Sequence, residues 1–422
     1  MKKKILSVIG TAAAVLCLTV GNAPAFSGAA ETEYIYTDED EILLAFDESE
    51  EYFLSLPDSP EILSNFGEDS YIYGDFLDSN NKAVYDAVKE WVTPSEEVLS
   101  IKMPQAITVS LSALPNSSDY SEEDAEALST AVFESCKSGI DSALYDYPEI
   151  YWLDVGKILI NFSNVTYSYS PRTRTYNFKI GTLLITPGTF DGFEDIDEAA
   201  SMKETFEKAI EDFPVSGDTR YEQLKSIHDQ IAEFTNYDIN GKYASSAMGA
   251  LVEAGVVCEG YSKAFKLICD RLGIPCVLVF GNYNEENRTA HMWNYVMMED
   301  GNWYAVDVTW DDLDGSGGKE LKYDYFLKGT KSFFTNHTEE NNYAMTTFTY
   351  PQLCEEDYIF QQETLNGDYN SDGKVNVTDL VICQNSLLGK EIEMFCDYNG
   401  DEEFNSLDIL AMRMYLVSAL DA

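Results

Sequence analysis

The chain has 422 residues, of which 45% are hydrophobic and 13% aromatic, so it can bury a substantial core and should divide into two or three domains. The same composition excludes wholesale disorder. The formal charge of −47 predicts an acidic surface that repels nucleic acid phosphates and anionic membranes. We therefore expect neither nucleic acid nor a membrane as a partner.

The first residues have the pattern of a secretory signal peptide. Lysines at 2–4 precede an apolar run over residues 5–20, and small residues follow at 23–25. Cys17 does not suit lipid attachment, because Leu16 precedes it where a small residue is expected. No later stretch approaches the roughly 18–20 apolar residues that span a bilayer. We assign residues 1–25 to a signal peptide and expect a soluble, secreted, extracellular protein.

The region behind the signal peptide changes in composition near residue 75. Residues 26–74 form an acidic segment rich in Asp, Glu and Ser, and residues 75–195 carry helical and strand patterns, which predicts an N-terminal α/β region. The predicted elements are helices over 80–91 and 122–144 and a hairpin of strands over 157–168 and 175–185.

Residues 196–350 indicate a helical layer that leads into an antiparallel sheet, which is an α+β arrangement. The strand signals include Asp300-Gly301, a strong hairpin turn between the last two strands. The predicted helices cover 199–212, 220–234, 246–254 and 258–272, and the predicted strands cover 276–281, 292–298 and 303–309.

Cys258 is the candidate nucleophile. It follows the short apolar stretch 255–257 and opens the helix 258–272, where the positive end of the helix dipole and free backbone N–H groups favour a thiolate. Its own backbone N–H is a candidate oxyanion donor. The alternative is a buried structural cysteine, which suits Cys269 and Cys276 better.

His291 and Asp307 supply the two partners that thiol chemistry requires. His291 opens the strand 292–298, and Asp307 lies on the returning strand pattern 303–309. An imidazole can take the thiol proton and return it later, while a carboxylate fixes the orientation and tautomer of the ring. Asp311 and Asp312 are alternatives for the orienting role. We interpret His228 and His337 as structural.

These residues resemble the transglutaminase-like family of cysteine acyl-transfer proteins. The resemblance covers about residues 227–343 and rests on four motifs. They are Ile227-His228-Asp229 with Tyr237-Asp238, Val257-Cys258-Glu259-Gly260-Tyr261-Ser262, His291-Met292-Trp293-Asn294, and residues 303–312. It implies a papain-like α+β core in a domain over 196–350, with Cys258 as nucleophile, His291 as general base and acid, and Asp307 as orienting residue. No cofactor for catalysis is expected.

The C-terminal region carries two loops with the spacing of EF-hand calcium sites. Oxygen-bearing side chains occupy positions 1, 3, 5, 9 and 12, and the backbone carbonyl at position 7 completes a set of oxygens around one point, as calcium requires. The first loop offers Asp368, Asn370, Asp372, Lys374, Asn376 and Asp379, and the second offers Asp397, Asn399, Asp401, Glu403, Asn405 and Asp408. We expect two calcium ions.

The duplicated loops, each followed by an apolar helix, resemble a type I dockerin over 365–422, behind a linker over 351–364. The resemblance implies a small all-α module that binds a cohesin module of a cellulosome-type scaffoldin. The second loop departs from the pattern at Glu402, where Gly is expected, which indicates a strained or weaker second site.

The leading hypothesis is an extracellular enzyme that acts on an acyl or amide group of a protein or peptide and is tethered to a scaffold. Peptide hydrolysis and glutamine acyl transfer both begin with thiolate attack, so the sequence leaves the two open. A catalytically silent binding module is the first alternative. A polysaccharide-degrading component is the second, and it would need two carboxylates at a defined separation.

Overall fold

A computed structural model describes residues 70–360, except 115–120, 284–288, 313–320 and 344–345, and residues 366–420, except 371–372, 390–395 and 402. The predicted signal peptide 1–25 and most of the acidic segment 26–74 lie outside the described residues. The chain divides into two compact units between Tyr358 and Ile359.

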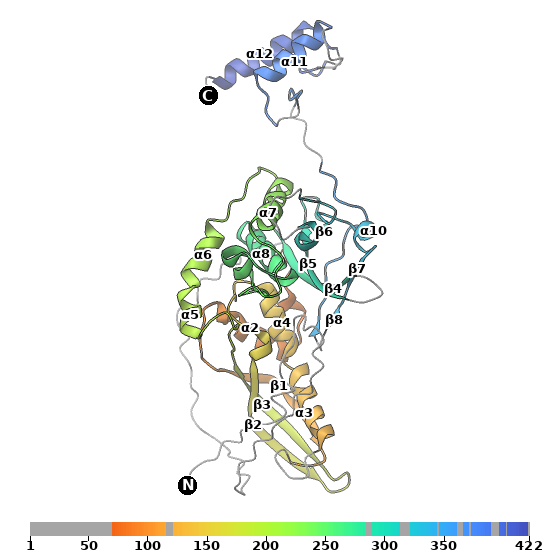
Figure 1. The fold of residues 1–422 in the computed structure, drawn as a ribbon. Helices are drawn as coiled ribbons and strands as arrows, with labels where there is room; N and C mark the ends of the chain where they lie inside the picture. The colour runs from red at the N-terminus through yellow and green to blue at the C-terminus, as the bar shows by residue number, and fades with distance from the viewer. Residues whose placement is uncertain are drawn as a thin grey trace. The chain divides into compact units, whose positions relative to one another are not determined.

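The N-terminal part of the first unit is built on a three-stranded antiparallel sheet in the order β1-β3-β2 (Figure 1). The predicted hairpin is present as β2 (Leu159–Ser170) and β3 (Thr175–Thr186). β1 (Leu99–Leu111) pairs with the other side of β3 and was not predicted. Its register shifts between Lys102 and Ile107, around Pro104, which cannot donate a ladder hydrogen bond.

Helices of this part pack on β1 and on one another. The elements are η1 (Tyr73–Phe76), α2 (Ser79–Val88), η2 (Lys89–Val92), α3 (Glu122–Glu134), α4 (Lys137–Asp146) and η3 (Val155–Lys157). Asp78 caps α2 and Ser121 caps α3, each by accepting backbone N–H groups of the first turn.

The prediction of one continuous helix over 122–144 was wrong, because α3 ends at Glu134 and α4 begins at Lys137. The side chain of Asn81 from α2 is the physical cause. Its Nδ2 donates to the Glu134 carbonyl at 2.9 Å, and its Oδ1 accepts from the Gly139 N–H at 3.0 Å. These are backbone groups that a continuous helix would pair internally.

The C-terminal part of the first unit is a four-stranded antiparallel sheet in the order β6-β5-β4-β7, covered by α8 (Figure 1). The fold is therefore α+β, as predicted, with helices preceding an antiparallel sheet. The strands are β4 (Cys276–Tyr283), β5 (Thr289–Met297), β6 (Trp303–Val306) and β7 (His337–Glu339), and the smaller pair is β8 (Asn342–Tyr343) with β9 (Thr346–Thr347). The helices are α5 (Ile196–Ser201), α6 (Lys203–Glu211), α7 (Arg220–Phe234), η4 (Gly249–Glu253), α8 (Cys258–Arg271), α9 (Val308–Asp311) and α10 (Thr330–Phe333).

The predicted bounds hold for α7 and nearly for α8, and fail for two other helices. The helix over 199–212 is broken at Met202 into α5 and α6. The segment 246–254 contains a π-helical turn instead of a regular helix, and it ends at Ala254 with φ of 59°. The strand predicted over 303–309 ends at Val306, because Asp307 turns the chain into α9.

The two parts of the first unit are joined by buried polar contacts. Asp146 at the end of α4 accepts the N–H groups of Tyr73 and Gly74 and the hydroxyl of Tyr85. The hydroxyl of Tyr73 donates to the Leu278 carbonyl of β4 at 2.5 Å. The N-terminal segment thus supports the sheet of the C-terminal part.

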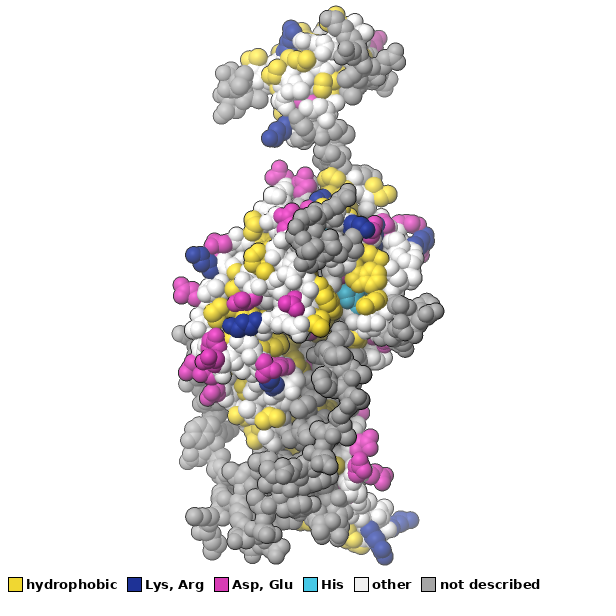
Figure 2. All heavy atoms as spheres, in the orientation of Figure 1, with side chains coloured by type: hydrophobic (Ala, Val, Ile, Leu, Met, Phe, Trp, Pro, Cys, Tyr) yellow, Lys and Arg dark blue, Asp and Glu magenta, His cyan; other side chains and the backbone are white. Residues whose placement is uncertain are grey.

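The second unit contains α11 (Val377–Leu387) and α12 (Ser406–Leu420), which pack against each other. Its small core consists of Cys383, Cys396, Ile409 and Met412. All seven cysteines among the described residues are free thiols. Acidic side chains are scattered over the visible face of the protein (Figure 2). Among the described helices, none combines the length and the apolar character needed to cross a bilayer.

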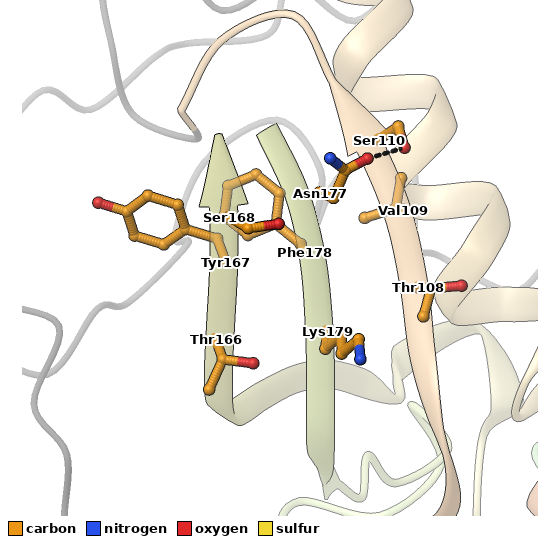
Figure 3. Close-up of a pocket in the computed structure, with 9 residues that line it drawn as sticks. All are labelled: Thr108, Val109, Ser110, Thr166, Tyr167, Ser168, Asn177, Phe178 and Lys179. Carbon is orange, nitrogen blue, oxygen red and sulfur yellow. Dashed lines mark hydrogen bonds between the residues drawn. The ribbon is translucent and has the colours of Figure 1, made fainter. Parts of the chain in front are cut away.

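A pocket of about 460 Å³ lies on the three-stranded sheet (Figure 3). Its lining comes from β1, β2 and β3 and is both polar and apolar, with Ser110 donating to Asn177 at 2.7 Å and Tyr167 beside Phe178. None of the predicted site residues lines this pocket.

Candidate active site and calcium loops

Cys258 is the first residue of α8, where backbone N–H groups have no acceptor within the helix. The Val257 N–H anchors the entry to this helix by donating to the Ala244 carbonyl at 3.0 Å. A Cβ at Gly260 would lie 2.7 Å from that same carbonyl oxygen and 2.6 Å from Val256 Cβ. Gly260 therefore allows the first turn of α8, which carries Cys258, to pack closely against the preceding loop.

His291 reaches the thiol from β5. Asn294, on the same strand, donates from Nδ2 to the Ser262 carbonyl of α8 at 3.0 Å, and the Ser262 hydroxyl donates to the Cys258 carbonyl at 2.9 Å. These bonds hold β5 against the first turns of α8. The Cys258 side chain lies close enough to the His291 ring to affect the pKa of the imidazole. Both residues are buried, with 5% of Cys258 and 4% of His291 exposed.

Asp307 completes the arrangement immediately after β6. Its Oδ2 lies 2.7 Å from His291 Nε2, and its Oδ1 accepts the Trp310 N–H at 3.2 Å as the cap of α9. Since Nε2 faces the carboxylate, Nδ1 is the nitrogen left for the thiol. The structure thus brings the three predicted residues Cys258, His291 and Asp307 together.

The carboxylate controls the electrostatics of the buried ring. Burial alone would lower the pKa of His291, but the charge and hydrogen bond of Asp307, together with Cys258, raise it to about 10. Burial would raise the pKa of Asp307, yet His291 and His337 hold it well below its usual range. The ring therefore carries two protons at neutral pH beside an ionised carboxylate.

His337 is a fourth member of the site, and the sequence interpretation as a structural histidine missed it. It is the first residue of β7, and its Nε2 lies 3.1 Å from Asp307 Oδ2. The ligand-type atoms of His291, Asp307 and His337 lie within 4.8 Å of one another, a set that suits a metal ion by composition. Hydrogen bonds between them already satisfy these atoms, so we assign no metal there.

The two alternative orienting carboxylates contact other residues. Asp311 Oδ2 lies 3.2 Å from Nε2 of His228, whose Nδ1 lies 3.0 Å from Asp229. The carboxylate of Asp312 accepts the Tyr261 hydroxyl at 2.5 Å. Each therefore joins α9 or its end to a helix, and neither bonds to His291.

Aromatic side chains surround the imidazole. The ring centroids of Tyr283 and Trp310 lie 5.6 and 6.0 Å from that of His291. Tyr237 is 47% exposed and lies near enough to Cys258 for their charges to interact. Burial, followed by the effects of Cys258 and Tyr283, raises the pKa of Tyr237.

The first calcium loop is organised by its last carboxylate. Asp379 accepts the N–H groups of Tyr369, Asn370 and Asn376 at 2.9, 3.1 and 2.9 Å. Asp368 accepts the N–H of Gly373, which has φ of 79° as the sharp turn requires. The predicted ligand Asp372 lies outside the described residues.

The second loop repeats this arrangement. Asp408 accepts the N–H groups of Tyr398, Asn399 and Asn405 at 3.0, 3.2 and 2.8 Å. Burial would raise the pKa of Asp408, but these N–H groups outweigh it and lower the pKa. Gly400, at position 4, takes the left-handed φ of 76°. Glu402 lies outside the described residues.

The carboxylates of the second loop fit a calcium ion. One carboxylate oxygen each of Asp397, Asp401 and Asp408 lies within 4.8 Å of the others. The predicted ligands Lys374 and Glu403 stand at position 7, where a backbone carbonyl would face the ion. The donor set consists of hard oxygen ligands, which calcium prefers.

The structure places a thiol at a helix end, an imidazole on a strand and a carboxylate just after a strand of the same α+β fold. Residues 209–308 match the model of the transglutaminase-like superfamily, and residues 366–417 match that of the dockerin type I domain. The chain therefore carries a transglutaminase-like domain followed by a type I dockerin domain. Such dockerins generally bind calcium, imply a cohesin partner and occur in secreted cellulosome components.

Solved structures similar to this chain include a TGase, with 14% sequence identity and a TM-score of 0.24, covering 39% of this chain and 47% of that one. A proposed cysteine protease from Cytophaga hutchinsonii has 16% identity and a TM-score of 0.20, covering 36% and 64%. The periplasmic domain of TgpA from Pseudomonas aeruginosa has 12% identity and a TM-score of 0.17, covering 53% and 91%. The chain spans less than two thirds of the first two structures. No curated protein matches it.

Proposed function

We propose that this protein is an extracellular cysteine-dependent acyl-transfer enzyme, tethered through its calcium-loaded dockerin to a cohesin of a cellulosome-type scaffoldin. The observation that carries the catalytic part is the 2.7 Å hydrogen bond between His291 and Asp307, with the Cys258 side chain near enough to influence the same ring. A buried imidazole between a thiol and a carboxylate is the arrangement that nucleophilic thiol chemistry requires.

In the proposed first step, the Cys258 sulfur attacks the carbonyl carbon of an amide. A C–S bond forms and the C–N bond breaks, while the proton on His291 Nδ1 passes to the leaving amine. In the second step, water or an amine attacks the thioester, His291 takes its proton, and the sulfur leaves. Asp307 keeps the ring oriented and stabilises its charge in both steps. Backbone N–H groups at the start of α8 would bind the oxyanion.

The tethering part rests on the paired loops and on an apolar stripe along α12. Leu407, Leu410, Met414 and Val417 are 54%, 53%, 66% and 60% exposed and recur at helical spacing. Ile409 and Met412, on the other side of the helix, are buried in the core of the unit. An exposed apolar stripe of this kind suits a protein partner.

A substrate panel with matched variants tests the catalytic part. Wild-type protein is incubated with casein, with a glutamine donor plus a labelled amine, and with plant polysaccharides. We expect activity on one of the first two, loss of that activity in Cys258→Ala, and retention in Cys354→Ala, which changes a more accessible thiol. Polysaccharide cleavage that survives Cys258→Ala, without protein activity, would contradict the proposal.

A further inference from the structure

We infer that His337 is a positioning residue that helps His291 to hold Asp307 in its working orientation. This inference rests on the proposed function. The two histidines reach one carboxylate oxygen from different strands: Oδ2 of Asp307 lies 2.7 Å from Nε2 of His291 on β5 and 3.1 Å from Nε2 of His337 on β7.

The hydrogen-bond directions follow from the carboxylate. An ionised carboxylate only accepts, so Nε2 of each histidine donates to it. With the Trp310 N–H on Oδ1, Asp307 accepts three hydrogen bonds, from three separate segments of the chain. A carboxylate bound in this way cannot rotate about its own axis without losing a donor. The orientation of the His291 ring is thereby fixed as well.

His337 is itself held firmly. It is 1% exposed, and its ring stacks on that of Phe333 with centroids 4.2 Å apart and an angle of 24°. Its Nδ1 lies 2.8 Å from Oδ1 of Asn336, whose Nδ2 donates to the Tyr325 hydroxyl at 2.7 Å. His337 lies on the edge strand β7, which pairs with β4, and the residue opposite His337 in this pairing is Tyr283. A packed ring with both nitrogens engaged is suited to orient a neighbour.

The contribution of this contact is electrostatic as well as geometric. A hydrogen bond to a buried charged group is worth about 1.5–3 kcal/mol, which corresponds to about one to two pH units in the protonation of Asp307. The other titratable groups near Asp307, among the described residues, are Tyr325 and Asp311. Neither makes a side-chain hydrogen bond to it in the described part of the chain, so His337 is the second donor side chain.

The test measures the rate at which iodoacetamide alkylates Cys258 in the full chain across pH, followed by peptide mass spectrometry. His337→Phe keeps a ring for stacking on Phe333 but removes the N–H donor, whereas His337→Gln keeps a donor. We expect the acid limb of the profile to move up by about one to two pH units in His337→Phe. His337→Gln, which keeps a donor, should show little of this shift.

His228→Gln is the matched control, because His228 is also fully buried between two carboxylates but does not contact Asp307. It should leave the profile unchanged. If the pH profile of His337→Phe is unshifted while Cys258 of the wild type is activated, the inference about His337 is wrong but the proposed function stands. A wild-type Cys258 that reacts no faster than an exposed model thiol overturns the proposed function instead.

A second measurement applies if His337→Phe does not fold. In protein labelled with ¹⁵N-histidine, the Nε2–H protons of His291 and His337 should both resonate far downfield. Both should move when Asp307 is replaced by Asn, while the His228 signal stays in place. A His337 signal that does not respond to Asp307→Asn refutes the positioning role.

Discussion

Nε2 of His291 lies 2.7 Å from Oδ2 of Asp307, with both side chains buried and the two residues carried by neighbouring strands or their ends. This short contact raises the pKa of the imidazole by more than burial lowers it. It therefore sets the pH range over which the ring can carry the proton that the proposed chemistry needs.

Asp307→Asn should slow alkylation of Cys258 most strongly under mildly alkaline conditions. Without the carboxylate charge, the pKa of His291 falls from about 10 toward its usual value near 6.5. At pH 8 the doubly protonated ring would then be about 30-fold less populated. Mass spectrometry of the Cys258 peptide after timed iodoacetamide treatment checks this, with Asp300→Asn as a control at a distant turn. An unchanged rate at pH 8 would show that Asp307 does not control the ring.

The contribution of His291 to stability should disappear as the solution becomes alkaline. Its pKa is higher in the folded protein, about 10, than in the unfolded chain, about 6.5. The stabilisation is thus complete below pH 6.5 and is lost as the pH rises through about 10. The free energy of unfolding of wild type minus that of His291→Gln should decrease between pH 6 and pH 10.

Tryptophan fluorescence suits this measurement because it reports only on the first unit. All five tryptophans lie before the division at Tyr358, at Trp91, Trp152, Trp293, Trp303 and Trp310. The contribution of Asp307 to stability depends on pH in the opposite direction, because the pKa of Asp307 is lower in the folded protein than in the unfolded chain. This contribution is present above the usual carboxyl pKa and is lost toward strongly acidic pH. If the difference in unfolding free energy between wild type and His291→Gln increased toward alkaline pH, the raised pKa of His291 would be contradicted.

Lys266→Met should destabilise the first unit by about 3–5 kcal/mol at pH 8, because it leaves Asp270 as a buried unpaired charge. The two groups lie 2.8 Å apart and are almost fully buried. Burial, opposed by Lys266, raises the pKa of Asp270 to about 7, so protonation of Asp270 should reduce the cost at pH 5. Urea unfolding at the two pH values measures the effect. Lys82→Met, at the exposed Lys82–Asp86 pair, should change stability by less than about 1 kcal/mol.

Calcium titration by calorimetry should give two ions for each chain after chelator treatment. Asp379→Asn and Asp408→Asn should each remove one ion, because each carboxylate both orders its loop and offers oxygen to the ion. Asp357→Asn, in the first unit, should leave the stoichiometry at two. No uptake by the wild-type protein would remove the calcium-dependent docking function.

A charge on the apolar stripe of α12 should weaken binding to a cohesin without affecting calcium. Leu410→Asp and Met414→Asp place a charge on side chains that are 53% and 66% exposed. The expected loss of affinity is at least about tenfold for each. Surface plasmon resonance against a cohesin panel measures it, with calcium stoichiometry as the control for folding. Equal binding by both variants would place the docking surface elsewhere.

Local patterns predicted those parts of the structure that depend on neighbours in sequence. The helix over residues 220–234 has a capping box at Thr219 and Glu222, and its predicted bounds match α7. Cys258 and Asp307 could be chosen because they lie at the boundaries of elements with a clear pattern, and His291 because it lies near the start of such an element; the structure brings all three together.

The remaining features depend on contacts between distant segments. The break between α3 and α4 is caused by Asn81, which the pattern of residues 122–144 does not contain. β1 was missed because Pro104 and its polar neighbours interrupt the alternation of buried residues. His337 was missed because β7 has only three residues, too few for a period, and its role follows from pairing with β4. The only local signal was that a histidine is rare in this chain, which has three.

The contacts of Tyr73 bear on how this protein can be expressed in pieces. Its N–H donates to Asp146 and its hydroxyl donates to the Leu278 carbonyl, so residues near 73 and 146 support β4 in the sheet that carries His291. A fragment trimmed to the family-matched residues 209–308, or to 196–350, would lose these donors and expose β4. The smallest piece that folds should instead begin near residue 70 and extend to Tyr358.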